Sequence, residues 1–238
     1  MSIHPQAIVD PSAILAEDVI VGPWSYIGPN VEIGSGTEIM SHVVVKGPTV
    51  IGKNNRIFQF SSVGEECQDK KYAGEPTRLE IGDNNIIREN CTIHRGTIQD
   101  NSLTKIGSNN LIMAYVHVAH DCVLGDNIIL ANNATLAGHV HVGDWAILGG
   151  GTMVHQFCKI GCHSMSAGGS IVLKDIPAFI MASGQSASAF GLNSEGLKRR
   201  GFSKDAMLEL KRAYKTIFRP GLTLKQAIEA LEEVASRV

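Results

Sequence analysis

The segment VIVGPWSYIGPNVEIGSGTEIMSHVVV, residues 19–45, has a large aliphatic residue at every sixth position. The same spacing continues in both directions without a miss, through Ile3, Val9, Leu15, Val21, Ile27, Ile33, Ile39, Val45, Ile51, Ile57 and Val63. At ordinary aliphatic content, chance would produce such a run only about once in a few million trials. The spacing returns over residues 81–93 and again over residues 106–160.

A period of six does not fit one face of an α-helix, because six steps of about 100° leave successive positions about 120° apart. It fits short strands separated by corners, and a hexapeptide repeat of this kind is typical of a parallel β-helix. Three repeats make a triangular coil of about 18 residues, and coils stack about 4.8 Å apart. The corners need left-handed backbone, which the sequence supplies with Asn54-Asn55, Asn84-Asn85, Asn109-Asn110 and Asn132-Asn133.

This pattern resembles that of the left-handed hexapeptide-repeat acyltransferases, which implies a left-handed coil. The repeat breaks twice, near residues 64–80 and 96–104, and loops inserted into a solenoid often form its binding surface. The predicted fold is therefore an all-β solenoid with an α-helical appendage. A left-handed parallel β-helix is predicted over residues 1–187, and a C-terminal α-helical domain over residues 188–238.

Two helices are predicted in that C-terminal domain. The first begins after Ser203, continues to Phe218 and is ended by Pro220-Gly221. The second begins at a capping box formed by Thr223 and Gln226. Residues 188–222 contain eight Lys or Arg against three Asp or Glu, which indicates either a solvated helical face or a basic surface for an acidic partner.

The composition argues against several classes of protein. The net charge of −2 argues against a nucleic-acid-binding protein. No stretch approaches the roughly 18 apolar residues that span a membrane, and the segment from Met1 to Ala13 lacks the pattern of a signal peptide. Five cysteines without paired spacing favour reduced thiols, so we expect a cytoplasmic protein in which Cys67 and Cys162 have no assigned role.

Histidines are concentrated in one part of the repeat, at His117, His120, His139, His141 and His155. Because one coil has about 18 residues, His120, Gly138 and Gln156 should stack as a column on one edge, with His139 and His155 beside them. If the second break inserts seven residues, His94 lies one coil below His120. The pairs within this set could also bind a metal, but no further ligand completes such a site convincingly.

Proton transfer near neutral pH fits this set of side chains better than metal binding. A neutral His120 could accept a proton, and Asp121 beside it could orient the ring. Gly138 has no side chain, so its backbone N–H could donate to a developing oxyanion.

Six stretches resemble the UDP-N-acetylglucosamine acyltransferase family: QDKKYAGEPT (68–77), TIHRGT (92–97), HVAHDC (117–122), LANNATLAGHV (130–140), HQFC (155–158) and EGLKRRGF (195–202). The resemblance implies transfer of an R-3-hydroxyacyl group from acyl carrier protein to the 3-hydroxyl of UDP-N-acetylglucosamine, the first step of lipid A biosynthesis. It also implies a homotrimer with sites between subunits, and no metal or cofactor beyond the phosphopantetheine of acyl carrier protein.

The resemblance further implies roles for single residues. His120 matches the general base, with Asp121 beside it, and Gly138 matches the oxyanion donor. Gly168 matches the position that limits acyl-chain length. Positions that match contacts to substrate, product or carrier are Asp69, Lys71, His94, His117, His139, His155, Gln156, Asn193, Glu195, Arg199 and Arg200. The chain departs from the family in having Gly184-Gln185-Ser186 where a Gly-Asn pair is usual, and in ending at Val238 before the usual last helices.

Two other functions remain open at this point. A related N-acyltransferase of the same pathway usually has an extra N-terminal domain, whereas the repeat here starts at Ile3. A non-catalytic β-solenoid predicts a face of repeated identical side chains, whereas the histidine edge has different polar residues at successive coils. The sequence leaves open the acyl-chain length and whether the acceptor carries a 3-hydroxyl or a 3-amino group.

Overall fold

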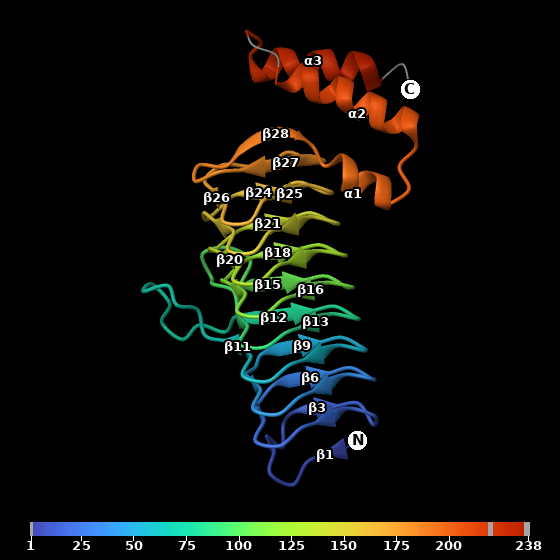
Figure 1. The fold of residues 1–238 in the computed structure, drawn as a ribbon. Helices are drawn as coiled ribbons and strands as arrows, with labels where there is room; N and C mark the ends of the chain where they lie inside the picture. Colours follow the sequence, from blue (N-terminus) through green and yellow to red (C-terminus); the bar gives the residue numbers. More distant parts are fainter. Residues whose placement is uncertain (1, 219–220, 236–238) are drawn as a thin grey trace.

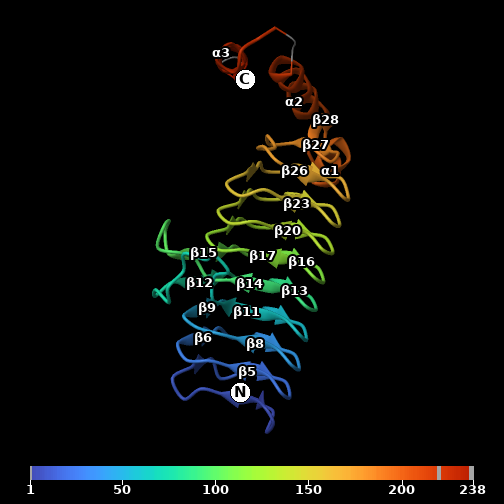
Figure 2. The same ribbon diagram turned by 90° about the vertical axis from the view of Figure 1, so that its left-hand side faces the viewer.

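The computed structural model describes residues 2–218 and 221–235, which form an elongated parallel β-helix with helices at its C-terminal end (Figures 1 and 2). Successive strands go in turn to three sheets, called here A, B and C. The predicted parallel β-helix is therefore confirmed. No described helix is long and apolar enough to cross a membrane.

The strands are mostly two residues long, because each repeat is only one strand and one corner. Sheet A contains β1 (Ser2–Ile3), β4 (Ile20–Val21), β7 (Glu38–Ile39), β10 (Arg56–Ile57), β13 (Ile86–Ile87), β16 (Leu111–Ile112), β19 (Ile129–Leu130), β22 (Ile147–Leu148), β25 (Met165–Ser166), β27 (Ile180–Ser183) and β28 (Ser188–Leu192). Sheet B contains β2 (Ile8–Val9), β5 (Tyr26–Ile27), β8 (Val44–Val45), β11 (Ser62–Glu65), β14 (Thr92–His94), β17 (His117–Val118), β20 (Thr135–Leu136), β23 (Met153–Val154) and β26 (Ile171–Val172). Sheet C contains β3 (Ile14–Leu15), β6 (Val31–Ile33), β9 (Thr49–Ile51), β12 (Arg78–Ile81), β15 (Leu103–Ile106), β18 (Val123–Leu124), β21 (His141–Val142) and β24 (Lys159–Ile160).

The strand register confirms both predicted insertions. Val45 pairs with Ile27, one regular coil of 18 residues below. Val63 pairs with Ile93, so the first loop adds twelve residues, and Ile93 pairs with Val118, so the second adds seven. Both loops leave the coil between sheets B and C, and they project from the same side (Figure 2). This B–C edge is also the edge that carries the corners at residues 119–122, 137–140 and 155–158.

The core is the interior of the coil. The aliphatic residues at every sixth position point inward and are almost fully buried from Val21 to Ile160. The asparagine pairs have two uses, because Asn54 and Asn84 take left-handed corners while Asn55 and Asn85 turn inward. The Asn85 N–H donates to Asn55 Oδ1 over 2.8 Å, and the Asn110 N–H donates to Asn85 Oδ1 in the same way. The side chains of these three buried asparagines therefore all have hydrogen-bond partners.

The C-terminal part differs from the prediction at its start. Residues 188–192, which the sequence placed with the helices, form β28, which folds back antiparallel on β27 and ends the parallel stacking. Three helices follow rather than two: α1 (Ser194–Arg199), α2 (Lys204–Ile217) and α3 (Leu224–Ala235). The short first helix has too few residues for a recognisable helical period. Ser203 caps α2 as predicted, and α2 contacts both β28 and α3.

Candidate active site

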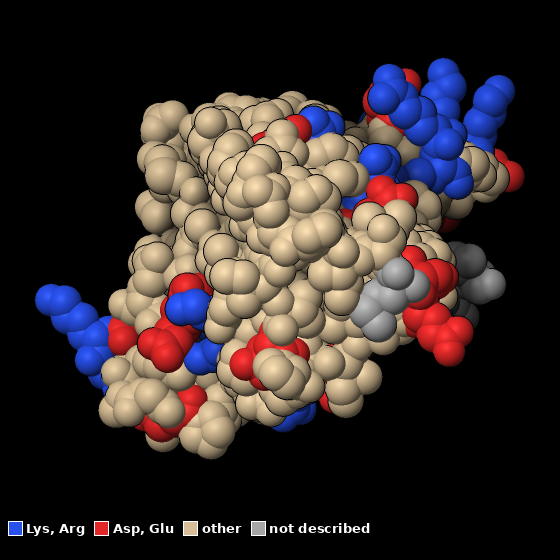
Figure 3. Space-filling view, turned by 90° about the horizontal axis from the view of Figure 1, so that it is seen from below, with Lys and Arg blue, Asp and Glu red and all other residues tan. Residues whose placement is uncertain are grey.

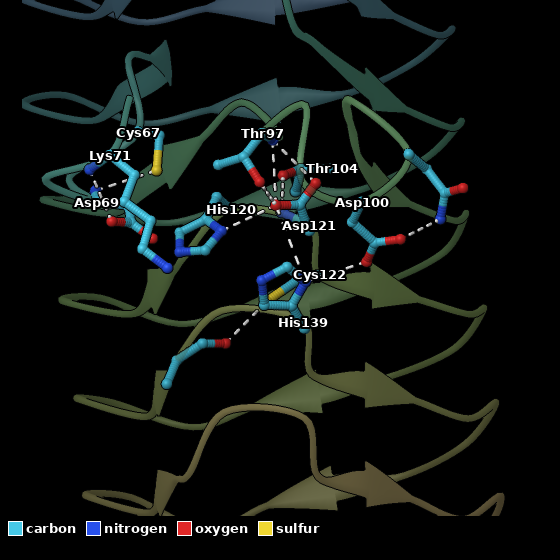
Figure 4. A network of polar contacts seen from close by, with 12 residues as sticks. Cys67, Asp69, Lys71, Thr97, Asp100, Thr104, His120, Asp121, Cys122 and His139 are labelled. Carbon is cyan, nitrogen blue, oxygen red and sulfur yellow. Dashed lines mark hydrogen bonds and ion pairs between the residues drawn. The ribbon is translucent and has the colours of Figure 1, made fainter. Parts of the chain in front are cut away.

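The B–C edge contains a cavity of about 490 Å³ where the two inserted loops meet the coil (Figure 4). Five of its lining residues were predicted from the sequence: Asp69, Lys71, His120, His139 and Gln156. The others are Thr97, Gln99, Asp100 and Phe157. We call this cavity, with these nine residues, the His120 cleft.

His120 and Asp121 form a hydrogen-bonded pair in this cleft. His120 Nδ1 lies 2.9 Å from Asp121 Oδ2, so the ring can donate its Nδ1–H to the carboxylate. The Nε2 atom is then left without a proton and can act as a base. The predicted orientation of His120 by Asp121 thus has a geometric basis.

The second inserted loop holds Asp121 in place. The Thr97 hydroxyl donates to Asp121 Oδ2 over 2.6 Å, and the Thr97 N–H also donates to the carboxylate. The Asp121 N–H in turn donates to Thr104 Oγ1. Burial raises the pKa of Asp121, but the hydrogen bonds from His120 and Thr97 outweigh this effect and hold it below its usual value. The carboxylate therefore stays charged beside the imidazole.

Gly138 lies one coil from His120, directly against its ring. A Cβ atom on Gly138 would lie 2.5 Å from His120 Cε1 and 2.6 Å from Nε2, closer than real contacts allow. The described residues offer no acceptor for the Gly138 N–H. Glycine therefore leaves both the space and a backbone donor next to the base.

His139 forms a second carboxylate–imidazole pair. Its Nδ1 lies 3.0 Å from Asp100 Oδ2 and 3.9 Å from Asp121 Oδ2. The ring stacks on Phe157 at a centroid distance of 4.4 Å and meets the His120 ring edge-on at 5.0 Å. These contacts fix the plane of His139 within the cleft.

His117, in the same coil as His120, and His94, one coil below, lie beside the cleft with ring centroids 5.1 Å apart. His117 Nδ1 is 2.7 Å from the Thr92 hydroxyl. Burial, followed by the neighbouring His117, lowers the pKa of His94 to about 4, and burial likewise lowers the pKa of His117. Both rings are therefore uncharged near neutral pH.

Gln156 and His155 follow in the coil above. Gln156 lines the cleft as the column predicted, whereas His155 is exposed outside the lining. His155 Nδ1 lies 3.1 Å from the Gln156 carbonyl oxygen, so the ring can donate to it.

Arg95 anchors the first inserted loop, although the sequence analysis assigned no role to this residue. Its guanidinium is buried and donates to the carbonyl oxygens of Gly47 and Gly64 and to the Tyr72 hydroxyl. Asp69 and Lys71, which lie in a turn of this loop, therefore line the cleft from a segment that Arg95 holds in place.

Four of the predicted contact residues, Asn193, Glu195, Arg199 and Arg200, line a different cavity, of about 580 Å³, at the edge between sheets C and A. Its lining, called here the α1 pocket, comprises Asn127, Ile129, Trp145, Ile147, Met165, Met181, Asn193, Glu195, Gly196, Arg199 and Arg200. Four of these residues, Ile129, Ile147, Met165 and Met181, belong to the apolar outer face of sheet A.

Four predicted residues in the α1 pocket differ in what holds them. Asn193 is buried as the N-cap of α1, where its side chain accepts from the Gly196 N–H and donates to a carbonyl oxygen of the coil. Arg199 is exposed and pairs with Glu195 at 3.0 Å. Arg200 lies over the Trp145 ring at 5.2 Å and 3.3 Å from His163 Nδ1, so it joins α1 to the coil.

Gly168 lies on the third edge, between sheets A and B. A Cβ atom there would come within 3.3 Å of the Gly150 carbonyl oxygen, a tight contact, and would meet no other atom within 4 Å. A single chain thus places the histidines, the α1 pocket and Gly168 on three different edges, and it does not bring them together.

His120, Asp121 and His139 also offer ligand atoms within 4.8 Å of one another, a spacing that a metal ion could use. Asp121 already accepts hydrogen bonds from Thr97 and His120, and a metal would have to displace the His120 bond. Hydrogen bonding accounts for every short contact in this set.

Two protein families match parts of the chain. The family described as UDP-N-acetylglucosamine O-acyltransferase, domain 2, matches residues 175–238, and the bacterial transferase hexapeptide family matches residues 103–138.

Full-length relatives are also similar. The chain is 61% identical to the acyl-(acyl-carrier-protein)–UDP-N-acetylglucosamine O-acyltransferase of Stutzerimonas stutzeri, over 98% of this chain and 91% of that protein. It is also 61% identical to the enzyme of the same name from Thiobacillus denitrificans, over 99% of this chain and 92% of that protein. The solved UDP-N-acetylglucosamine O-acyltransferase of Moraxella catarrhalis superposes with a TM-score of 0.98 at 51% identity, over 100% of this chain and 92% of that one.

Proposed function

The chain belongs to the UDP-N-acetylglucosamine acyltransferase family, and on that basis we propose how the His120 cleft performs the reaction of the family. The protein has the left-handed β-helix of that family and is an acyltransferase, which uses acyl carrier protein as donor and UDP-N-acetylglucosamine as acceptor in the first step of lipid A biosynthesis. We propose that the group transferred is an R-3-hydroxyacyl chain and that the acceptor atom is the 3-hydroxyl oxygen. The observation that carries the mechanism is the contact between His120 and buried Asp121.

His120 acts as the general base. Its Nδ1–H donates to Asp121, so Nε2 accepts the proton of the sugar hydroxyl while the hydroxyl oxygen attacks the thioester carbon. The charged Asp121 stabilises the imidazolium that results. When the C–S bond breaks, the imidazolium returns this proton to the phosphopantetheine sulfur, which leaves as a thiol.

Gly138 acts on the carbonyl oxygen of the donor. Attack on the thioester carbon places negative charge on this oxygen, and a fixed backbone N–H stabilises such a charge. Gly138 supports this role because it lies directly against the His120 ring and the described residues offer its N–H no acceptor.

Asp69, Lys71, His94, His117, His139 and Gln156 contact the substrates in this proposal. They lie in or beside the His120 cleft. No cofactor is needed beyond the donor's own phosphopantetheine, because the base and the oxyanion donor both come from the chain.

We propose that a homotrimer completes the site, because the predicted contact residues of one chain lie on separate edges. The outer face of sheet A supports packing against a second copy, since it presents an apolar stripe made of Ile86, Leu111, Ile129, Ile147, Met165 and Met181. Sheet C instead presents Glu32, Glu80, Lys105 and Lys159 outward, so it suits the solvent side. Packing through sheet A would bring the α1 pocket of one copy near the His120 cleft of another.

The acyl carrier protein is proposed to dock on α1 and α2. Lys198, Arg199, Lys204, Lys211, Arg212 and Lys215 are exposed on these helices. Figure 3 shows Lys and Arg side chains projecting on the side of the coil where α1 and α2 lie in Figure 1. Such a surface attracts an acidic partner. We also propose a cytoplasmic location, a reducing compartment that suits five free cysteines.

A direct assay tests the proposed function. Purified protein is incubated with UDP-N-acetylglucosamine and R-3-hydroxyacyl carrier proteins, and the acylated sugar nucleotide is detected by mass spectrometry. A UDP-sugar with a 3-amino group serves as the competing acceptor. We expect His120→Ala to lose about 10²–10³-fold in kcat, the share of a general base, whereas His141→Ala, on the exposed face of β21, stays near wild type. Near-wild-type turnover by His120→Ala would overturn the assignment.

A further inference from the structure

The His120 cleft contains two carboxylate–imidazole pairs rather than one. His120 pairs with Asp121 at 2.9 Å, and His139, one coil along, pairs with Asp100 at 3.0 Å (Figure 4). The two rings meet edge-on at 5.0 Å. The proposed function uses only the first pair, so the second has no assigned purpose.

The two pairs share one point of competition. Asp121 Oδ2, the partner of His120, is also only 3.9 Å from His139 Nδ1. The same carboxylate already accepts hydrogen bonds from Thr97. If His139 lost its own partner, its Nδ1 would be within reach of a carboxylate that His120 needs.

Asp100 supplies that partner from the second inserted loop. Its N–H donates to the Thr97 carbonyl oxygen, and its Oδ1 accepts from the Asn101 side chain over 2.8 Å, while its Oδ2 faces His139. Phe157 stacks on the His139 ring and so fixes the plane of this ring. Thr97 and Asp100 thus let one loop hold both imidazole pairs.

We propose that Asp100 is a positioning residue that holds His139 as its Nδ1–H tautomer and so reserves Asp121 for His120. The proposal rests on the proposed function of the cleft. With Nδ1–H given to Asp100, the remaining ring nitrogen of His139 is an acceptor, which suits a hydroxyl group of the sugar. The charged or titratable groups that face this pair are Asp121, His120, Asp69 and Lys71.

The test compares Asp100→Ala with Ile98→Ala, an exposed substitution in the same loop. Selective ¹⁵N labelling of histidine reports the tautomer of each ring by NMR without any turnover. In Asp100→Ala only, we expect the His139 Nδ1–H to turn from Asp100 to Asp121, and the His120 ring to shift from its Nδ1–H form toward its Nε2–H form because it loses part of this acceptor. We also expect kcat to fall about ten- to hundredfold, the usual loss when a partner that orients a functional imidazole is removed. Asp100→Asn, whose amide oxygen can accept the same hydrogen bond, should recover part of this loss.

A double-mutant cycle separates this role from general damage to the loop. If Asp100 acts through His139, Asp100→Ala should lower kcat much less in a His139→Ala background than in the wild type. Unchanged His120 ring signals in Asp100→Ala, or fully additive losses in the cycle, would overturn the proposal. Because the NMR result needs no substrate, a protein that failed the acyl-transfer assay would refute the function without deciding the tautomer.

Discussion

Gly138 sits so close to His120 that a Cβ atom on it would lie 2.5 Å from the ring carbon Cε1. Gly138→Ala must therefore push the imidazole away from its place. We expect kcat to fall by about 10²-fold or more, similar to the loss of an oxyanion donor, while the melting temperature changes little.

The matched control for that substitution is Gly150→Ala, at the same repeat position on another edge. A Cβ atom there meets only the Asn132 carbonyl oxygen, at 3.4 Å. Steady-state kinetics on both variants make the comparison, and equal effects would show that the contact with His120 is not what matters.

A side chain at Gly168 would have one tight contact, with the Gly150 carbonyl oxygen, and would fill the space beyond it, which should shorten the preferred acyl chain. Each buried methylene stabilises a bound chain by about 0.8 kcal/mol, and overfilling a fitted site costs about 1–3 kcal/mol. Gly168→Met should therefore move the preference toward a shorter hydroxyacyl donor. Competition between carrier proteins loaded with different chains measures this, and an unchanged preference would place the end of the chain elsewhere.

Stability should depend on pH through His94. Its folded pKa is about 4, whereas an unfolded histidine titrates near 6.5. Below about pH 6.5 the unfolded chain binds a proton at His94 that the folded chain does not bind. The free energy of unfolding is therefore unaffected by His94 above that pH, and it decreases as the pH falls toward 4. The loss is of the order of 3 kcal/mol.

Denaturant unfolding of wild type and His94→Gln between about pH 7.5 and pH 4.5 checks this pH dependence. The wild type should lose stability more steeply than the variant on acidification. Parallel curves for the two proteins would show that His94 does not carry the effect.

Arg95 should control the order of the first inserted loop. Hydrogen bonds from a charged group are each worth about 1.5–3 kcal/mol, so Arg95→Met should release the loop. We expect faster tryptic cleavage after Lys70 and Lys71, and a KM for the sugar nucleotide that rises at least about tenfold. Arg78→Met is the control, because its exposed pair with Glu80 should contribute little; equal cleavage in both variants would contradict this role.

Substitutions of the neighbouring residues Arg199 and Arg200 should change different properties of the protein. Arg199 is exposed, so Arg199→Ala should raise the KM for acyl carrier protein and weaken its salt dependence. Arg200 stacks on Trp145, so Arg200→Ala should instead lower thermal stability and loosen α1. Kinetics at several salt concentrations and thermal melts distinguish the two; an Arg199 effect confined to the sugar nucleotide would assign it to the other substrate.

The sequence predicted the coil and the central column because both depend on a strict period. One register fixes where His120, Gly138 and Gln156 lie, and an insertion of seven residues placed Ile93 beneath Val118 as expected. His94 lies against His117 in that register rather than directly beneath His120.

The period says nothing about the inserted loops, which is why Thr97, Gln99 and Asp100 were missed. Loop residues carry no repeat that would show which of them turn toward the coil. The anchoring role of Arg95 could not be predicted either, because its burial depends on how the first loop folds over it. Asn193, which was predicted as a contact residue and lines the α1 pocket, is also the N-cap of α1, and an asparagine just before a helix is a recognisable capping signal.

The two inserted loops lengthen the chain, and the coils on either side of them still pair, with one shift of register between Val63 and Glu65 where the first loop begins. The distance between His120 and Gly138 is therefore set by the pairing of neighbouring strands. Asp69, Lys71 and Asp100 instead lie on inserted loops, whose positions the strand pairing does not fix. Grafting the first inserted loop between relatives should for this reason exchange substrate preference, whereas the second loop must stay because Thr97 and Asp100 hold Asp121 and His139. The chemical step thus depends on the coil and the second loop, and the first loop is free to vary with the substrate.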